Sequence, residues 1–209
     1  MSQDSPSPQR RVQRLLNMKA TTLTGCEAAR EQFVLRAEAE GLIDVAVERH
    51  DSPLGRLTLA ATADGVVRIG LANETYDDVL HDVAARISPR VIRTSRGVVS
   101  TLRRELDEYF AGARKTFDVA IDWRLTKGFR HKILRAAACI PYGETASYGQ
   151  VAADAGSARA VRATGSALAN NPLPILVPCH RVRPASGALG DYRGGRDAKA
   201  FLLDLERAR

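Results

Sequence analysis

Apolar and polar residues alternate with a period of two along three segments that follow Ile43. These segments are IDVAVER at 43–49, GRLTLAA at 55–61 and VVRIGLA at 66–72. An alternation of this kind is typical of strands with one face in a core. Asp64 and Gly65 form a turn signal between the second and third segments. The pattern therefore predicts an antiparallel sheet.

The period changes to a helical one after this sheet. Two helices are predicted, the second ending at Gly112, from apolar residues that recur every three or four positions: Val79, Leu80, Val83 and Ile87, then Val98, Leu102, Leu106 and Tyr109. The alternating segment FDVAIDW, residues 117–123, predicts a further strand. Before the sheet, residues 26–40 resemble a charged helix, and the Ser, Pro and charged residues of the first dozen positions predict disorder.

Helical spacing dominates the rest of the chain. Thr126 is a candidate N-cap for a helix with Phe129, Ile133, Leu134 and Ala137 facing inward. Two short segments follow, residues 147–155 and 157–170, each beginning at a serine able to cap it and separated by Gly156. This layout predicts a helix-turn-helix, although an ordinary helical hairpin has the same pattern. A last helix is expected from Asp197 to Arg207.

These elements together predict an α+β fold. A small antiparallel-sheet domain at residues 41–123 precedes a mostly helical, winged-helix-like domain at 124–209 that contains the helix-turn-helix. Residues 1–40 are expected to form a partly disordered extension. No internal repeat is visible.

The excess of basic over acidic residues lies entirely in the C-terminal part of the chain. Residues 123–209 hold 14 Lys and Arg against 6 Asp and Glu, a net of +8, whereas residues 1–122 hold 17 against 18. A basic module is the electrostatic pattern expected of a nucleic-acid binder. The alternative is a solvated face on a basic protein.

Cysteine spacing and the chain start suggest the compartment. Cys26, Cys139 and Cys179 form neither a zinc knuckle nor a CxxC pair, and no signal peptide or membrane-spanning apolar run is visible. We expect a cytoplasmic bacterial protein with reduced thiols, without a cofactor or metal, in which Cys26 and Cys139 are buried apolar residues. A zinc site from Cys26, His50 and His81 is an alternative, but these three ligands are scattered along the sequence.

Residues 170–182, NNPLPILVPCHRV, form the segment with the clearest chemical signal. Three prolines fix its backbone angles, so Cys179 is expected to point in a defined direction. His180 adjoins this cysteine, and Arg181 and Arg183 are close in sequence, which favours a thiolate. The competing interpretation is a loop histidine that does not contact the sulfur.

The sequence PCHRV, followed by GALGDYRGG and LLDLE and preceded by IPYGETASYGQVA, resembles the methylated-DNA–protein-cysteine methyltransferases. The resemblance covers most of residues 95–209, the sheet domain fits the family's N-terminal domain, and residues 1–40 are not explained. It implies stoichiometric, irreversible repair of O6-alkylguanine in DNA, with O4-alkylthymine as an open second substrate.

The resemblance also implies catalytic roles. Cys179 matches the alkyl acceptor, and His180 and Glu206 match the pair that removes the thiol proton through a water. Asn171 matches an asparagine that ties the second helix of the helix-turn-helix to the cysteine segment. Tyr148 matches a hydroxyl that donates to N3 of the flipped guanine.

Further matches concern DNA and the base pocket. Arg162 matches the arginine that fills the stack after base flipping, and Pro174, Val182, Tyr192 and Arg193 match pocket positions. Arg193 replaces a serine of some members, so only its backbone N–H is expected to assist O6. Small residues of the second helix, with Ala163 and Gly165 among them, would let it approach the minor groove of double-stranded DNA, or would serve tight packing. A monomer without membrane contact is expected.

Three other functions remain open. A lesion-binding protein of the alkyltransferase-like kind would have the same fold, but such proteins carry another residue at the acceptor position, which here is Cys179. A regulator that senses methylation of this cysteine would need a second DNA-binding or zinc module. A cysteine hydrolase would need an oxyanion hole, for which there is no sequence signal.

Overall fold

The structure is a computed structural model that describes residues 28–29, 31–37 and 39–207, and it divides into two compact units, residues 1–43 and 44–209. In the first unit, residues 28–29, 31–37 and 39 are helical, as the sequence pattern predicts. The disorder expected of the first dozen residues, and the expectations for Cys26, lie outside the described residues.

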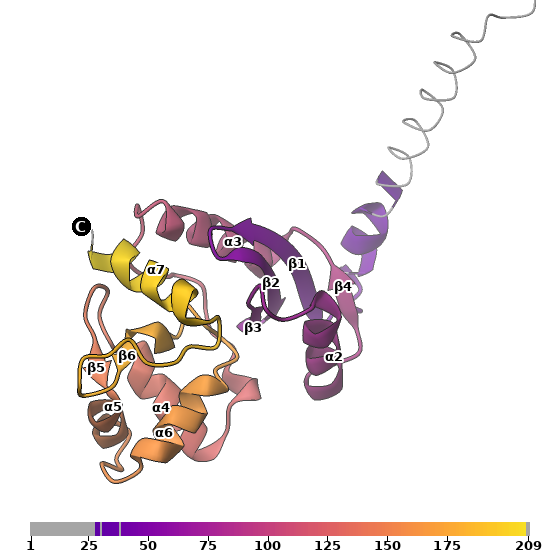
Figure 1. The fold of residues 1–209 in the computed structure, drawn as a ribbon. Coiled ribbons are helices and arrows are strands. Elements are labelled where there is room, and N and C mark those ends of the chain that lie inside the picture. Colours follow the sequence, from indigo (N-terminus) through magenta and orange to yellow (C-terminus); the bar gives the residue numbers. More distant parts are fainter. Residues whose placement is uncertain (1–27, 30, 38, 208–209) are drawn as a thin grey trace, which may run out of the picture. The chain divides into compact units, whose positions relative to one another are not determined.

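A mixed four-stranded sheet begins the second unit, and Figure 1 shows its strands. Strands β1 (Val45–Ser52), β2 (Gly55–Thr62) and β3 (Gly65–Gly70) form the antiparallel arrangement that the alternation predicts. A short strand that the sequence analysis does not predict, β4 (Val91–Arg93), pairs in parallel with β1 and gives the order β3-β2-β1-β4. Three residues are too few to show a period.

Helices α2 (Tyr76–Arg86) and α3 (Gly97–Phe110) pack on opposite faces of this sheet. The α2 face and the α3 face bury different side chains: Val45, Val47, Val67, Val79 and Val83 on the first, and Leu57, Leu59, Ile69, Leu102 and Leu106 on the second. Because both faces are covered, β3 is buried along its whole length. Thr75 begins α2 as an N-cap, its side chain accepting from the backbone N–H of Asp78.

The strand predicted at 117–123 is wrong. Ile121 makes an isolated bridge to Val66, and Trp123 already belongs to the 3-10 helix η1 (Trp123–Leu125). The backbone N–H of Asp118 is satisfied by the buried carboxylate of Glu105 rather than by a neighbouring strand. The alternation at 117–123 therefore reflects a connecting segment with one side against the core.

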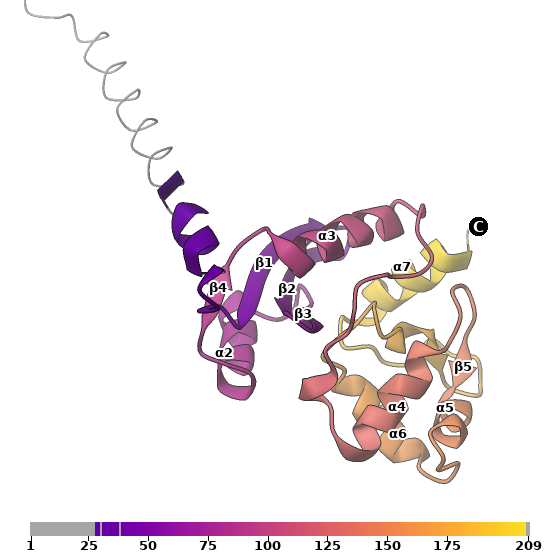
Figure 2. The same cartoon turned by 180° about the vertical axis from the view of Figure 1, so that it is seen from behind.

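The C-terminal part is mostly helical within the described residues (Figure 2). Its helices are α4 (Gly128–Ala138), α5 (Tyr148–Asp154), α6 (Val161–Ala169) and α7 (Arg196–Arg207). A small parallel pair, β5 (Ala146–Ser147) and β6 (Val182–Arg183), and the 3-10 helix η2 (Cys179–Arg181) complete this part. Helix α4 begins after Lys127, so the predicted N-cap at Thr126 is wrong. Thr126 instead ends η1, where its hydroxyl donates to the carbonyl of Trp123.

Helices α5 and α6 form the predicted helix-turn-helix. Ser147 caps α5 in a capping box with Gln150, and the turn passes through Gly156 at a positive φ of 83°. The second predicted cap is wrong, because α6 begins at Val161 and Ala160, not Ser157, precedes it. The first helix thus has a strong local start signal, whereas the second begins without a side-chain cap.

One apolar cluster joins the two parts of residues 44–209. It runs from the α3 face of the sheet to buried residues of α4, α7 and the segment before Cys179, including Ile133, Leu134, Leu173, Ile175 and Leu202. This shared core holds the cysteine segment against both parts of the chain. None of the helices in residues 28–29, 31–37 and 39–207 has the length and apolar character of a membrane-spanning segment.

Candidate active site

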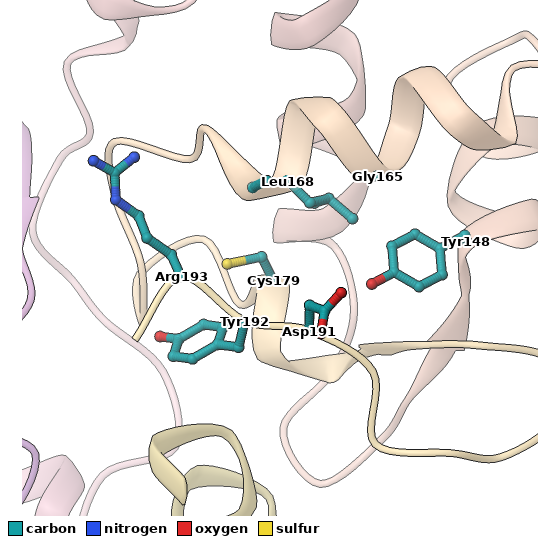
Figure 3. Close-up of a pocket in the computed structure, with 8 residues that line it drawn as sticks. Tyr148, Gly165, Leu168, Cys179, Asp191, Tyr192 and Arg193 are labelled. Atoms are coloured by element: carbon teal, nitrogen blue, oxygen red, sulfur yellow. The ribbon is translucent and has the colours of Figure 1, made fainter. Parts of the chain in front are cut away.

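Cys179 lies at the start of η2 and lines a cavity of about 270 Å³. Figure 3 shows this cavity between α6, the cysteine segment and the loop that carries Tyr192. Its lining residues are Tyr148, Gly165, Leu168, Ala169, Cys179, Asp191, Tyr192 and Arg193. Drug-sized ligands occupy pockets of about 300–1,000 Å³, so this volume suits a smaller group such as one nucleobase.

Asn171 fixes the segment that presents the cysteine. Its Nδ2 donates to the Val177 carbonyl at 2.9 Å and to the Cys179 Sγ at 3.1 Å, and its Oδ1 accepts from the Leu173 N–H at 3.0 Å. The same segment holds Ile175 at a positive φ of 76°, which is strained for a β-branched residue. The buried amide of Asn171 helps to hold this strained loop and directs a donor at the sulfur.

Behind the cysteine lies a buried charged network centred on Glu206 of α7. The carboxylate accepts from His180 Nε2 at 3.0 Å and from Arg181 Nε and Nη2, both at 2.9 Å. Burial opposes ionisation of Glu206, but the hydrogen bonds from His180 and Arg181 outweigh it and hold its pKa well below the ordinary value. Glu206 is therefore ionised at neutral pH.

The ionised carboxylate determines which nitrogen of His180 can act as a base. A carboxylate only accepts hydrogen bonds, so His180 Nε2 carries the proton that it donates to Glu206. His180 Nδ1 is then the acceptor, and it is buried without a partner among the residues that the structure describes. Burial lowers the pKa of His180, against the opposing effect of Glu206, so the ring is neutral at pH 7.

The resting sulfur of Cys179 is a thiol, contrary to the thiolate that the neighbouring residues suggest. Burial raises the pKa of Cys179, although the Asn171 hydrogen bond and the charge of Lys199 act in the opposite direction. Arg181 is engaged by Glu206, and Arg183 donates to the carbonyls of Gly187 and Ala188. The hydrogen bonds of both arginine side chains are therefore directed to these groups and not to the Cys179 sulfur.

Lys199 is a functional candidate that the sequence analysis missed. Its buried Nζ donates to the carbonyls of Val182 at 2.7 Å and Asp191 at 3.1 Å. Burial lowers the pKa of Lys199 to about 8, opposed by the nearby Cys179. Lys199 precedes Leu202, Leu203 and Glu206 by three, four and seven positions, so helical spacing alone places it on the buried face of α7.

The structure brings five of the predicted site residues to the cavity wall: Cys179, Tyr148, Gly165, Tyr192 and Arg193. His180, Glu206 and Asn171 lie behind this wall, bonded as described above. Pro174 is buried and bridges to Val177, and the Val182 carbonyl already accepts from Lys199. A carbonyl has a second lone pair, so it can still accept another donor. Leu168, Ala169 and Asp191 are wall residues that the sequence analysis did not select.

Arg193 turns its side chain away from the cavity (Figure 3). Its guanidinium binds the Glu74 carboxylate, with Nη2 to Oε2 at 2.6 Å, and its carbonyl accepts from Asn73 Nδ2 at 2.7 Å. These contacts hold the loop that carries Tyr192 and Arg193 against the segment after β3. They also agree with the expectation that the Arg193 side chain is not available to a base in the pocket.

Arg162 and Ala163 are exposed on α6, the second helix of the helix-turn-helix, whereas Gly165 on the same helix lines the cavity. The small residue Ala167 is buried and therefore serves packing within the protein. One exposed surface of α6 is thus free to meet a partner while another side borders the pocket.

Cys139 corrects the expectation of a buried cysteine. It is the C-cap of α4 and is exposed, because it lies one turn after the exposed Arg135, on the side of the helix opposite to the buried Ile133, Leu134 and Ala137. Cys26 lies outside the described residues, so the hypothesis of a zinc site from Cys26, His50 and His81 lies partly outside them as well. Residues 28–29, 31–37 and 39–207 contain no group of three or more His, Cys, Asp or Glu able to hold a metal.

A helix-turn-helix whose second helix borders a cavity with a buried cysteine defines a DNA-binding protein with an acceptor thiol. Two family descriptions match the chain: "6-O-methylguanine DNA methyltransferase, ribonuclease-like domain" at residues 45–123 and "6-O-methylguanine DNA methyltransferase, DNA binding domain" at residues 128–208. The chain belongs to the O6-methylguanine DNA methyltransferase family.

Curated relatives agree with this assignment. The constitutive methylated-DNA–protein-cysteine methyltransferase of Bacillus subtilis is 39% identical over 161 residues, covering 75% of this chain and 92% of the relative. The Mycobacterium tuberculosis enzyme of the same name is 40% identical over 159 residues, covering 76% and 90%.

Solved structures agree as well. The crystal structure of the Mycobacterium tuberculosis O6-methylguanine methyltransferase has a TM-score of 0.67 at 38% identity, covering 79% of this chain and 94% of that one. A structure of the Mycobacterium tuberculosis OGT in complex with DNA has a TM-score of 0.66 at 37% identity, covering 78% and 93%.

Proposed function

We propose that this protein repairs O6-alkylguanine in DNA by moving the alkyl group irreversibly onto the sulfur of Cys179. The observation that carries the proposal is the placement of Cys179 in a base-sized cavity beside α6, with Asn171 and the His180–Glu206 pair around it. The family relationship supports the same reaction. Because the product is a thioether, the protein acts once.

DNA engagement begins at α6. The exposed Arg162 and Ala163 lie on this helix, and the basic excess of residues 123–209 supplies contacts to phosphates. O6 of a stacked guanine cannot be reached by a buried sulfur, so the base is rotated out of the duplex at a cost of a few kcal/mol. We assign Arg162 to the vacated position in the stack and the minor groove to α6.

Proton transfer from the thiol precedes attack. Since Cys179 is protonated at rest, its proton passes through a bridging water to Nδ1 of His180, the free acceptor of the ring. Glu206 remains ionised and stabilises the imidazolium that forms. The Asn171 amide and the Lys199 ammonium stabilise the thiolate, and the second of these contributions declines as the pH rises through about 8.

The transfer itself replaces one bond with another. The sulfur forms a bond to the alkyl carbon while the bond from that carbon to O6 breaks and leaves its electron pair on the base. Tyr148, whose pKa is raised by burial and therefore keeps its proton, donates to N3 of the guanine. Pro174, Val182, Tyr192 and the backbone of Arg193 shape the pocket for the base.

The wider setting follows from the same chemistry. The sheet domain, residues 41–123, and the acceptor domain, residues 124–209, act together on duplex DNA as a monomer. We propose that the protein acts in the bacterial cytoplasm at the nucleoid, because the reaction needs a reduced thiol and chromosomal DNA.

The proposal predicts stoichiometric repair. With methylated duplex in tenfold excess, repaired guanine should accumulate to one equivalent per protein and then stop. The alkyl group stays on the sulfur as a thioether, so the thiol is not regenerated. The measurement is the amount of repaired base against time at two protein concentrations. Continued product formation after the first equivalent would contradict the proposal, and a lesion binder without transfer would give no product.

A further inference from the structure

Tyr109 connects the sheet domain to the charged network behind the cysteine. It lies near the end of α3, is fully buried, and its hydroxyl donates to Glu206 Oε1 at 2.6 Å. No part of the mechanism above uses this contact. The catalytic carboxylate of one domain is thus bonded by a side chain of the other.

Three donors share Glu206 Oε1. Besides Tyr109, this oxygen accepts from His180 Nε2 at 3.0 Å and from Arg181 Nη2 at 2.9 Å. Each donor reduces the basicity that the carboxylate offers to the others. The Tyr109 hydroxyl and the proton on His180 Nε2 therefore compete for the same oxygen.

The tyrosine ring is held rigidly. Its centroid lies 5.5 Å from that of Phe110, 5.4 Å from Phe117 and 6.1 Å from Tyr142. Burial raises the pKa of Tyr109 far above its ordinary value, and the negative charge of Glu206 raises it further. The hydroxyl therefore always retains its proton. It is a fixed donor aimed at one oxygen.

Other charged and titratable groups around the pair are also fixed by contacts. Arg181 binds Glu206 from η2, the backbone N–H of Gly143 donates to Oε2 at 3.2 Å, and the Lys199 charge acts on His180 from α7. Cys179 is the neighbour of His180 in η2, and the Tyr192 ring lies 6.2 Å from the His180 ring. None of these groups changes when the Tyr109 hydroxyl is removed.

We propose that Tyr109 is a positioning residue for proton transfer, supplied by the sheet domain, which sets the basicity of His180 by occupying Glu206 Oε1. Without its hydroxyl, the carboxylate interacts more strongly with the His180 imidazolium, and the pKa of His180 rises. This inference rests on the proposed function, because it concerns the base of that reaction. Through Tyr109, the sheet domain would contribute to proton transfer as well as to folding.

The test is the pH dependence of single-turnover methyl transfer by Tyr109→Phe. The rate falls at acid pH as His180 becomes protonated, and this acid limb should move to higher pH by roughly half a unit to one unit. A hydrogen bond to a charged group changes a pKa by about one to two units, and His180 is one bond away from the change. The plateau rate should fall by less than about tenfold.

Tyr142→Phe is the matched control. Its ring belongs to the same aromatic cluster, but its hydroxyl donates to the Leu205 carbonyl at 3.3 Å and not to Glu206. This variant should keep the wild-type acid limb. A loss of packing alone would change the melting temperature or plateau rate in either variant without moving the limb.

A second variant should shift the acid limb in the opposite direction, and its result does not depend on the folding of Tyr109→Phe. Difluorotyrosine at position 109 is a stronger donor with the same ring, so the acid limb should move to lower pH. If the limb stays in place in the folded variants, Tyr109 has only a structural role and the inference is overturned. If the wild-type protein transfers no methyl group, the proposed function itself fails, so the two failures are distinguishable.

Discussion

Cys179→Ala is expected to abolish methyl transfer while leaving binding to methylated duplex within about twofold of wild type. The substitution removes the nucleophile but keeps the cavity wall, the exposed face of α6 and the basic charge of residues 123–209. Transfer is measured as repaired guanine after single turnover, and binding by fluorescence anisotropy at a fixed salt concentration.

Cys139→Ala is the matched control, because this cysteine is exposed and does not line the cavity. It should transfer methyl at the wild-type rate. Residual transfer by Cys179→Ala, or its loss in Cys139→Ala, would show that another thiol is the acceptor.

Glu206→Gln is expected to reduce both the transfer rate and the stability strongly. The amide cannot stabilise the His180 imidazolium, and loss of such general-base catalysis costs about 10²–10⁴-fold in rate. The buried Arg181 also loses its charged partner, and breaking a buried pair costs about 3–5 kcal/mol. For a chain of this size, that corresponds to a decrease in melting temperature of roughly 6–20 °C.

The loss of stability in Glu206→Gln should depend on pH in a defined direction. The pKa of Glu206 is lower in the folded protein than in the unfolded chain, so its stabilisation is present above the unfolded value and is lost as the pH falls towards the folded value. Glu206→Gln should therefore lose much of its deficit in acid. Asp204→Asn, an exposed change on the same helix, should match wild type in rate and melting temperature. If Glu206→Gln matched wild type too, the network would be irrelevant to the reaction.

Local patterns predicted much of the fold. The three antiparallel strands, both sheet helices and the helix-turn-helix follow from periodicity and from signals such as the Ser147 cap, all of which act within a few residues. The strand predicted at 117–123 was wrong because alternation records one-sided burial and cannot show whether a partner strand is present. Similarly, Thr126 and Ser157 are able to cap a helix, but the helices begin elsewhere.

The same distinction between local and long-range information applies to the active site. Cys179 and His180 are adjacent and could be recognised from their segment, but the groups that set their chemistry come from distant positions. Tyr109 is 97 residues from Glu206, and Glu74 is 119 residues from Arg193. Burial, which keeps the cysteine protonated, also depends on the whole core. Neither kind of information is present in a local motif.

Whether Cys179 accepts the alkyl group is decided by the mass of the intact protein after incubation with an oligonucleotide duplex containing O6-methylguanine, followed by peptide mapping. We expect the protein to gain one methyl group and the peptide containing Cys179 to carry it. An unchanged mass in protein that binds the duplex, or a methyl group found only on another cysteine, would contradict this expectation.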